Sequence, residues 1–124
     1  MKILLIFFSL LLSQGSEDAT IRDIGTALSA GSSKELINFC NKTVEIKING
    51  ESSNYSKAQA EVVLKDFFRK NAPKEFNYIH QGTSEGLKYT IGKYTHEGGA
   101  FRVVMFIKKI GDNYLIDTMN FSKE

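Results

Sequence analysis

One histidine in an extended segment has the side chain best suited to acid–base chemistry. His80 follows Phe76 and Tyr78 at intervals of two, so strand alternation places these three side chains, together with Gly82, on one face. If that face lines a pocket, the imidazole can act as a general base near neutral pH. No carboxylate stands beside it in the sequence to orient the ring. This favours an ordinary half-exposed or hydrogen-bonded strand histidine over a catalytic one.

Two charged residues in later strand-like runs are the other candidates for chemistry. Arg102 shares a face with Val104 and Phe106, so it is either a cation inside an aromatic cavity or an ordinary surface residue. In a cavity it would bind a ligand carboxylate or phosphate, but charged residues are rarely buried without a partner, which favours the surface. Strand alternation places Asp117 on one face with Leu115, Met119 and Phe121, and a pair between Arg102 and Asp117 across neighbouring strands would have a structural role.

Other chemical signatures are missing from the sequence. No His, Cys, Asp or Glu cluster has metal-ligand spacing, so we expect no metal and no cofactor. Gly98-Gly99 is typical of a hairpin turn and not of a phosphate-binding loop. Cys40, the single cysteine, is expected to be a small buried residue at the end of a helix. We therefore predict no catalytic residue with a complete partner set.

The composition indicates an ordinary globular protein. The 124 residues are 42% hydrophobic and 24% charged, which suits one domain with a core of aromatic and aliphatic side chains. The formal net charge of +2 is small, and the basic residues form no run longer than Lys108-Lys109. Nucleic-acid binders usually carry a clustered basic face. We expect no nucleic-acid partner.

The first fifteen residues are typical of a signal peptide. Lys2 supplies a positive start, residues 3–12 are apolar apart from Ser9, and Ser13-Gln14-Gly15 forms a small-residue cleavage site. The apolar run is too short to span a bilayer core of about 30 Å. We therefore expect cleavage after Gly15, export to the periplasm or medium, and no membrane association of residues 16–124.

Hydrophobic periodicity predicts three helices. The longest covers Tyr55–Asn71, with a capping box at Ser56 and Gln59 and a left-handed end at Asn71. A first helix, from Ser16 or Asp18 to about Ser29, and a short second helix ending at Cys40 form an N-terminal helical hairpin.

The rest of the chain has the alternation of β-strands. A half-buried strand at Thr43–Ile48 turns at Asn49-Gly50 into a short return segment. Four longer strands follow Pro73, joined by short turns that contain glycine; they cover Glu75–Thr83, Leu87–Tyr94, Ala100–Lys109 and Tyr114–Phe121. Helices on one face of an antiparallel sheet define an α+β domain.

Several short segments within this order of elements carry a family resemblance. They are Phe39-Cys40, Val44–Ile48, Tyr55–Ala60, Phe67-Phe68, His80-Gln81-Gly82 and Phe101–Val103. Over residues 17–122 the chain resembles the nuclear transport factor two and ketosteroid isomerase superfamily, which has a cystatin-like α+β fold. It is also similar to a family of short exported bacterial proteins with no assigned function.

The resemblance implies a cone-shaped domain over residues 16–124. In such a cone a curved antiparallel sheet wraps around the long helix, often leaving a pocket between the sheet and the helices. The candidates to line that pocket are Tyr55, Phe68, Tyr78, His80, Arg102 and Asp117. Tyrosine in particular offers apolar area with one polar group.

The sequence leaves three functional hypotheses. We expect a non-enzymatic domain that binds a small ligand or a protein partner, with a homodimer through the open sheet face as one arrangement. The alternative is a small isomerase or dehydratase that uses His80 with Asp117 or Tyr78, which requires His80 inside a closed pocket. The third is an accessory or immunity-like interaction protein with an exposed apolar patch and no pocket. Fold alone does not decide among them.

Overall fold

The computed structural model describes residues 19–124. The predicted signal peptide at residues 1–15 lies outside this range. None of the helices within the described part of the chain is both long enough and apolar enough to cross a membrane.

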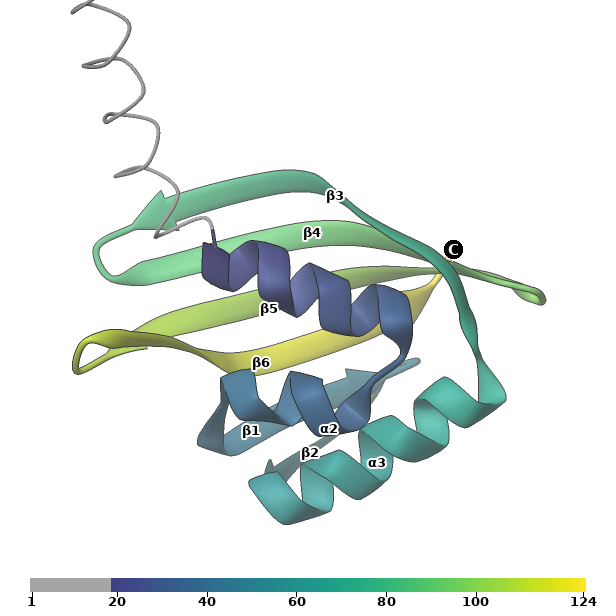
Figure 1. The fold of residues 1–124 in the computed structure, drawn as a ribbon, viewed down its shortest axis with the longest axis horizontal. Coiled ribbons are helices and arrows are strands. Elements are labelled where there is room, and N and C mark those ends of the chain that lie inside the picture. The colour runs from purple at the N-terminus through teal and green to yellow at the C-terminus, as the bar shows by residue number, and fades with distance from the viewer. Residues whose placement is uncertain (1–18) are drawn as a thin grey trace, which may run out of the picture.

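Three α-helices, one 3-10 helix and six strands make up the described chain. A helix over residues 19–30 comes first. The elements that follow are α2 (Ser33–Leu36), the 3-10 helix η1 (Ile37–Phe39), β1 (Cys40–Ile48), β2 (Glu51–Ser56), α3 (Lys57–Lys70), β3 (Pro73–Ser84), β4 (Leu87–His96), β5 (Gly99–Ile110) and β6 (Asn113–Lys123). Figure 1 shows the helices on one side of a curved sheet. The α+β class predicted from the sequence is confirmed.

The predicted start of the long helix is confirmed, and its predicted end is wrong in detail. The Ser56 side chain accepts a hydrogen bond from the Gln59 backbone N–H, and the Gln59 side chain accepts one from the Ser56 backbone N–H. This capping box satisfies donors that the first turn leaves without a partner. Asn71 has φ −132°, which is not left-handed. Its side-chain amide instead donates to the Phe67 carbonyl at 3.2 Å.

The six strands form one sheet in the order β2-β1-β6-β5-β4-β3. Neighbouring strands are antiparallel except β1 and β6, which pair in parallel. The sheet is therefore mixed, where the sequence predicted an antiparallel one. The last strand, β6, lies between β1 and β5 in the middle of the sheet and runs in the same direction as β1.

Cys40 lies at the start of β1 and not at the end of a helix as predicted. Its Cα pairs with Ile116 of β6, which explains why the helical pattern stops at Phe39. The side chain is fully buried, and its S–H donates to the Leu36 carbonyl at 3.7 Å. Burial raises the pKa of the thiol to about 12, so the thiol stays protonated at neutral pH.

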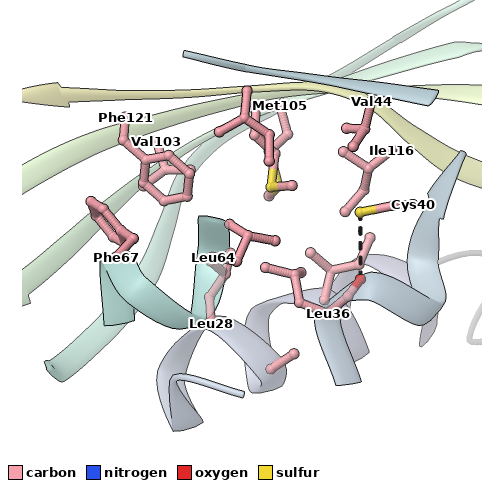
Figure 2. Packing of buried hydrophobic residues seen from close by; sticks show 14 of the residues in the cluster. Leu28, Leu36, Cys40, Val44, Leu64, Phe67, Val103, Met105, Ile116 and Phe121 are labelled. Atoms are coloured by element: carbon pink, nitrogen blue, oxygen red, sulfur yellow. Dashed lines mark hydrogen bonds between the residues drawn. The ribbon is translucent and has the colours of Figure 1, made fainter. Parts of the chain in front are cut away.

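The core fills the space between the helices and the inner face of the sheet, the face that they cover. Leu28, Leu36 and Leu64 from the helices meet Val103, Met105 and other side chains of the sheet (Figure 2). All five of these side chains are completely buried. The centre of the fold is thus packed with apolar side chains, and the candidate site lies towards the β3 edge of the sheet.

Two β-bulges change which side chains face the core. In β3 the register with β4 shifts between Tyr78 and His80. Tyr78 pairs with the buried Gly92, whereas His80 pairs with Ile91 on the outer face of the sheet, the face away from the helices. The expectation that Tyr78 and His80 share a face is therefore wrong. The extra residue of the bulge, Ile79, interrupts the alternation.

The second bulge lies in β6. The register with β5 shifts between Phe106 and Ile107, opposite Asp117. Ile116, Met119 and Phe121 are buried in the core, whereas Asp117 pairs with a lysine of β5. The expectation that Asp117 shares a face with Met119 is wrong for the same physical reason.

Candidate functional site

A groove lies between the helix of residues 19–30 and strand β3. Its volume is about 540 Å³, and it is open to solvent on one side. The helix contributes Ile21, Arg22, Gly25, Thr26 and Ser29, and the strand contributes Phe76, Asn77, Tyr78 and Gln81. We call this the helix–β3 groove. It has the volume of a small-molecule site and is lined by a mixture of polar and apolar side chains.

Tyr78 fixes the floor of the groove. Its hydroxyl donates a hydrogen bond of 2.6 Å to the Ile21 carbonyl on the helix. A Cβ atom on Gly25 would lie 2.9 Å from the Tyr78 ring, so glycine at this helical position lets the ring lie against the helix. Phe76 packs edge-on against the same ring, at a centroid distance of 5.0 Å. These contacts hold the two walls at a fixed separation.

The groove presents hydrogen-bonding groups and one positive charge. Burial raises the pKa of Tyr78, so the phenol remains protonated at neutral pH and acts as a hydrogen-bond donor, not as a base. Arg22 is exposed and brings a positive charge to the rim. Thr26, Ser29 and Gln81 add neutral donors and acceptors. The lining residues suit a small polar molecule with an apolar part.

Two polar side chains of β4 are buried. Lys88 is 5% exposed, and its ammonium group lies 4.4 Å from the centre of the Tyr114 ring. Thr90 is fully buried, and its hydroxyl has no hydrogen-bond partner among residues 19–124. Thr90 pairs with Gln81 of the groove lining. The buried hydroxyl of Thr90 thus lies beside the groove.

His80 is far from the position that the enzyme hypothesis requires. The side chain is exposed on the outer face of the sheet, where its Nε2 atom shares a hydrogen bond of 3.1 Å with the Tyr89 hydroxyl. It does not line the helix–β3 groove. The bulge at Ile79 that turns His80 outward also turns Gln81 inward, opposite the buried Thr90. His80 therefore is not a base inside a closed pocket.

The two charged candidates are also separated from the groove. Arg102 is exposed between the buried Phe101 and Val103, as the surface interpretation expects. Asp117 forms an ion pair of 3.3 Å with Lys108 and not with Arg102. The expected Arg102–Asp117 contact does not form because the register of the two strands places Arg102 opposite Ser122, whereas Asp117 lies near Lys108.

The two remaining aromatic candidates belong to the core. Phe68 is 6% exposed and stacks on Tyr94, with ring centroids 6.2 Å apart. Tyr55 in β2 is half-buried and packs against the core cluster. Of the six residues suggested by the resemblance, Tyr78 alone lines the helix–β3 groove.

Sequence reasoning missed most of the groove because a contact between distant segments creates it. Arg22, Thr26 and Ser29 recur at intervals of three and four, which places them on one helical face. Gly25 lies on that face too, in the middle of a helix where glycine is unfavourable. Gly25 was the one sequence feature that could have indicated the groove, because a glycine within a helix can mark a place where another side chain packs closely against the helix. In this protein that side chain is Tyr78.

Acidic, histidine and cysteine side chains do not gather into a group of three or more that could hold a metal ion within residues 19–124. The described site therefore offers hydrogen bonds and one cation.

Comparison with known proteins places this fold in an uncharacterised family. The profile of a family described as a domain of unknown function, DUF4783, matches residues 21–122. A DUF4783 crystal structure from Bacteroides ovatus is 34% identical, covers 82% of this chain and 93% of its own, and has a TM-score of 0.80. One from Bacteroides uniformis is 28% identical, with coverages of 83% and 95% and the same TM-score.

More distant structures share the fold alone. An NTF-2 like protein of unknown function from Burkholderia xenovorans is 12% identical, covers 86% of this chain and 83% of its own, and has a TM-score of 0.66. The superfamily suggested by the sequence is thereby confirmed for the fold. No curated protein matches the chain.

Proposed function

The chain belongs to the DUF4783 family, and we propose that it is an exported, non-enzymatic domain that binds a small molecule in the helix–β3 groove. The observation that carries the proposal is the groove of about 540 Å³ whose walls are joined by the Tyr78–Ile21 hydrogen bond. Preformed concave sites of this size are the usual places for small ligands. Arg22 and Gln81 at the groove supply polar contacts that orient a ligand.

The alternative, an isomerase or dehydratase, loses its proposed base. That hypothesis needs His80 inside a closed pocket with a second polar group, and His80 is exposed on the outer face. Of the two partners named for His80, Tyr78 keeps its proton at neutral pH because burial raises its pKa, and Asp117 is ion-paired with Lys108. Binding is thus the better-supported activity of the groove.

Export forms part of the proposal because of the residues at the start of the chain. The apolar run over residues 3–12 and the small residues before Ser16 form the pattern that signal peptidases cut. Mass spectrometry of the protein from fractionated cells should give the mass of residues 16–124 in the periplasm or medium. A full-length mass in the cytoplasm would contradict export.

A homodimer through the outer sheet face is a second proposal, with protein interaction as its function. Tyr89 pairs with Phe106 and Ile91 pairs with Val104 across β4 and β5, which forms an aromatic and aliphatic patch on that face. Phe106 is 41% exposed although it is a large apolar side chain. A second copy of the same patch would cover it. Sedimentation of the protein and its Phe106→Glu variant tests this: a dimer lost in the variant supports it, and a wild-type monomer refutes it.

A ligand screen with one blocked variant tests the groove. A library of small polar metabolites is scanned by thermal shift against the wild-type protein and Ser29→Phe. A ligand at a hundredfold excess over its dissociation constant stabilises the protein by about 2.7 kcal/mol, which raises the melting temperature by roughly 10–20 °C. We expect the shift to disappear in Ser29→Phe because the ring occupies the groove.

Ala30→Phe provides the matched control. Ala30 is exposed on the same helix, one residue further along, and does not line the groove. The control should keep the full shift. A hit that survives Ser29→Phe, or one lost equally in both variants, would place binding elsewhere and contradict the proposal.

A further inference from the structure

A second concave surface lies at the opposite end of α3 from its capping box. It has a volume of about 590 Å³ and is formed by the end of α3, the connection to β3, the β4–β5 turn and the last residue of β6. Its lining residues are Arg69, Lys70, Asn71, Ala72, Pro73, Lys74, His96, Glu97, Gly98 and Lys123. We call it the basic cleft. No residue of the helix–β3 groove belongs to it.

Positive charge is concentrated in this cleft. Four cations meet one carboxylate there, whereas residues 16–124 as a whole carry 15 basic and 14 acidic groups. Asp66 pairs with Arg69 at 2.7 Å and with Lys70 at 3.1 Å, which offsets part of their charge. Lys74 and Lys123 form no ion pair within residues 19–124. Their charges remain available to a ligand.

The backbone that carries these cations is held by hydrogen bonds. Pro73 pairs with His96 across β3 and β4. The buried Tyr94 donates its hydroxyl to the Asn71 carbonyl, which fixes the connection after α3. The Lys123 backbone N–H donates to the Asn49 side chain at 3.3 Å. The cations therefore extend from a fixed framework, although their side chains are exposed.

His96 adds an oriented hydrogen-bond donor. Its ring stacks on Phe101 with centroids 5.2 Å apart, and its Nδ1 atom accepts a hydrogen bond of 3.1 Å from the Gly98 backbone N–H. A neutral imidazole that accepts at Nδ1 carries its proton on Nε2, so Nε2 donates. The charged ring would donate there as well.

We propose that the basic cleft binds the phosphate group of a small molecule. A phosphate monoester carries close to two negative charges at neutral pH and has several acceptor oxygens, which match the cations and the donors of His96. The negative end of the α3 dipole also lies here, and Arg69 and Lys70 in its last turn offset that potential. Because the cations are exposed, binding is weakened by salt.

The experiment titrates the isotope-labelled protein with inorganic phosphate and, separately, with glycerol phosphate, at constant ionic strength set with sodium chloride. Backbone amide shifts are recorded by two-dimensional NMR. We expect saturable shifts at Gly98, at residues 70–72 and at Lys74. Tighter binding of glycerol phosphate would assign an organic phosphate as the ligand, and equal affinity would assign free phosphate.

Charge variants decide whether the cleft itself is responsible. Lys74→Gln with Lys123→Gln removes the two unpaired cations and should weaken phosphate binding about tenfold, at a few-fold per exposed charge. Lys42→Gln with Lys47→Gln removes the same total charge from exposed positions of β1 and should leave the affinity unchanged. Equal losses in both variants, or shifts that do not saturate, would overturn the proposal.

Discussion

Replacing Tyr78 by phenylalanine is the sharpest test of how the groove is built. The change removes the hydroxyl that donates at 2.6 Å to the Ile21 carbonyl and leaves the ring between Gly25 and Phe76. A hydrogen bond of this kind contributes about 0.5–1.5 kcal/mol net. For a domain of this size, a loss of about 1 kcal/mol lowers the melting temperature by roughly 4–8 °C.

The assay combines urea unfolding with hydrogen exchange. We expect the free energy of unfolding of Tyr78→Phe to fall by about 1 kcal/mol. The amides of residues 19–30 should also exchange faster, because the hydrogen bond ties that helix to β3. Exchange in α3 should change only by the global loss of stability.

Tyr55→Phe is the matched control. Tyr55 is half-buried, and its hydroxyl makes no hydrogen bond within residues 19–124. Its free energy of unfolding should stay within about 0.5 kcal/mol of the wild type. If Tyr78→Phe unfolds like this control and exchange over residues 19–30 is unchanged, the Tyr78 contact does not hold the groove together.

Three further predictions test the framework. Alkylation of Cys40 at pH 8 should be at least about 1000-fold slower than in the unfolded chain, because burial raises the pKa of the thiol from 9.0 to about 12. Stability should also fall as the pH rises above 9.0, since the unfolded thiol ionises first; Cys40→Ala should lose this slope below pH 10.0, and the buried phenols Tyr78 and Tyr94, whose pKa values burial also raises, should keep a slope above it. Gly92→Ala should cost roughly 1–3 kcal/mol in urea unfolding, because its Cβ atom would lie 2.4 Å from the Phe76 ring; a neutral result would contradict the packing. Ser56→Ala should cost about 1 kcal/mol through loss of the α3 cap, whereas Ser53→Ala on exposed β2 should cost little; equal effects would refute the role of the cap.

Local patterns made the helix and the strands predictable. The capping box at Ser56 and the apolar period of α3 depend on residues within two turns, so the sequence contains them directly. Asn49-Gly50 likewise marks the turn between β1 and β2, where Asn49 has φ 49° and Gly50 has φ 89°.

The features that depend on bulges or on contacts between distant segments were not predicted correctly. The sequence analysis assigned His80 and Asp117 to the wrong faces of the sheet. Alternation cannot show where a bulge, here at Ile79 in β3 and at Asp117 in β6, inserts an extra residue. Cys40 was assigned to a helix because its partner Ile116 lies 76 positions further along the chain. The groove likewise depends on a contact between Gly25 and Tyr78, which lie far apart in the sequence. Of the residues that we expected to line a pocket, Tyr78 alone lines the groove.

NMR mapping of a bound ligand would locate its binding site on the protein. With a hit from the thermal-shift screen, we expect the largest amide shifts at Gly25, Thr26 and Gln81, which line the helix–β3 groove. The outer-face residues Tyr89 and Val104 should show little change. If the shifts instead centre on the outer face, or if no ligand moves the groove amides, this protein does not bind small molecules in the groove.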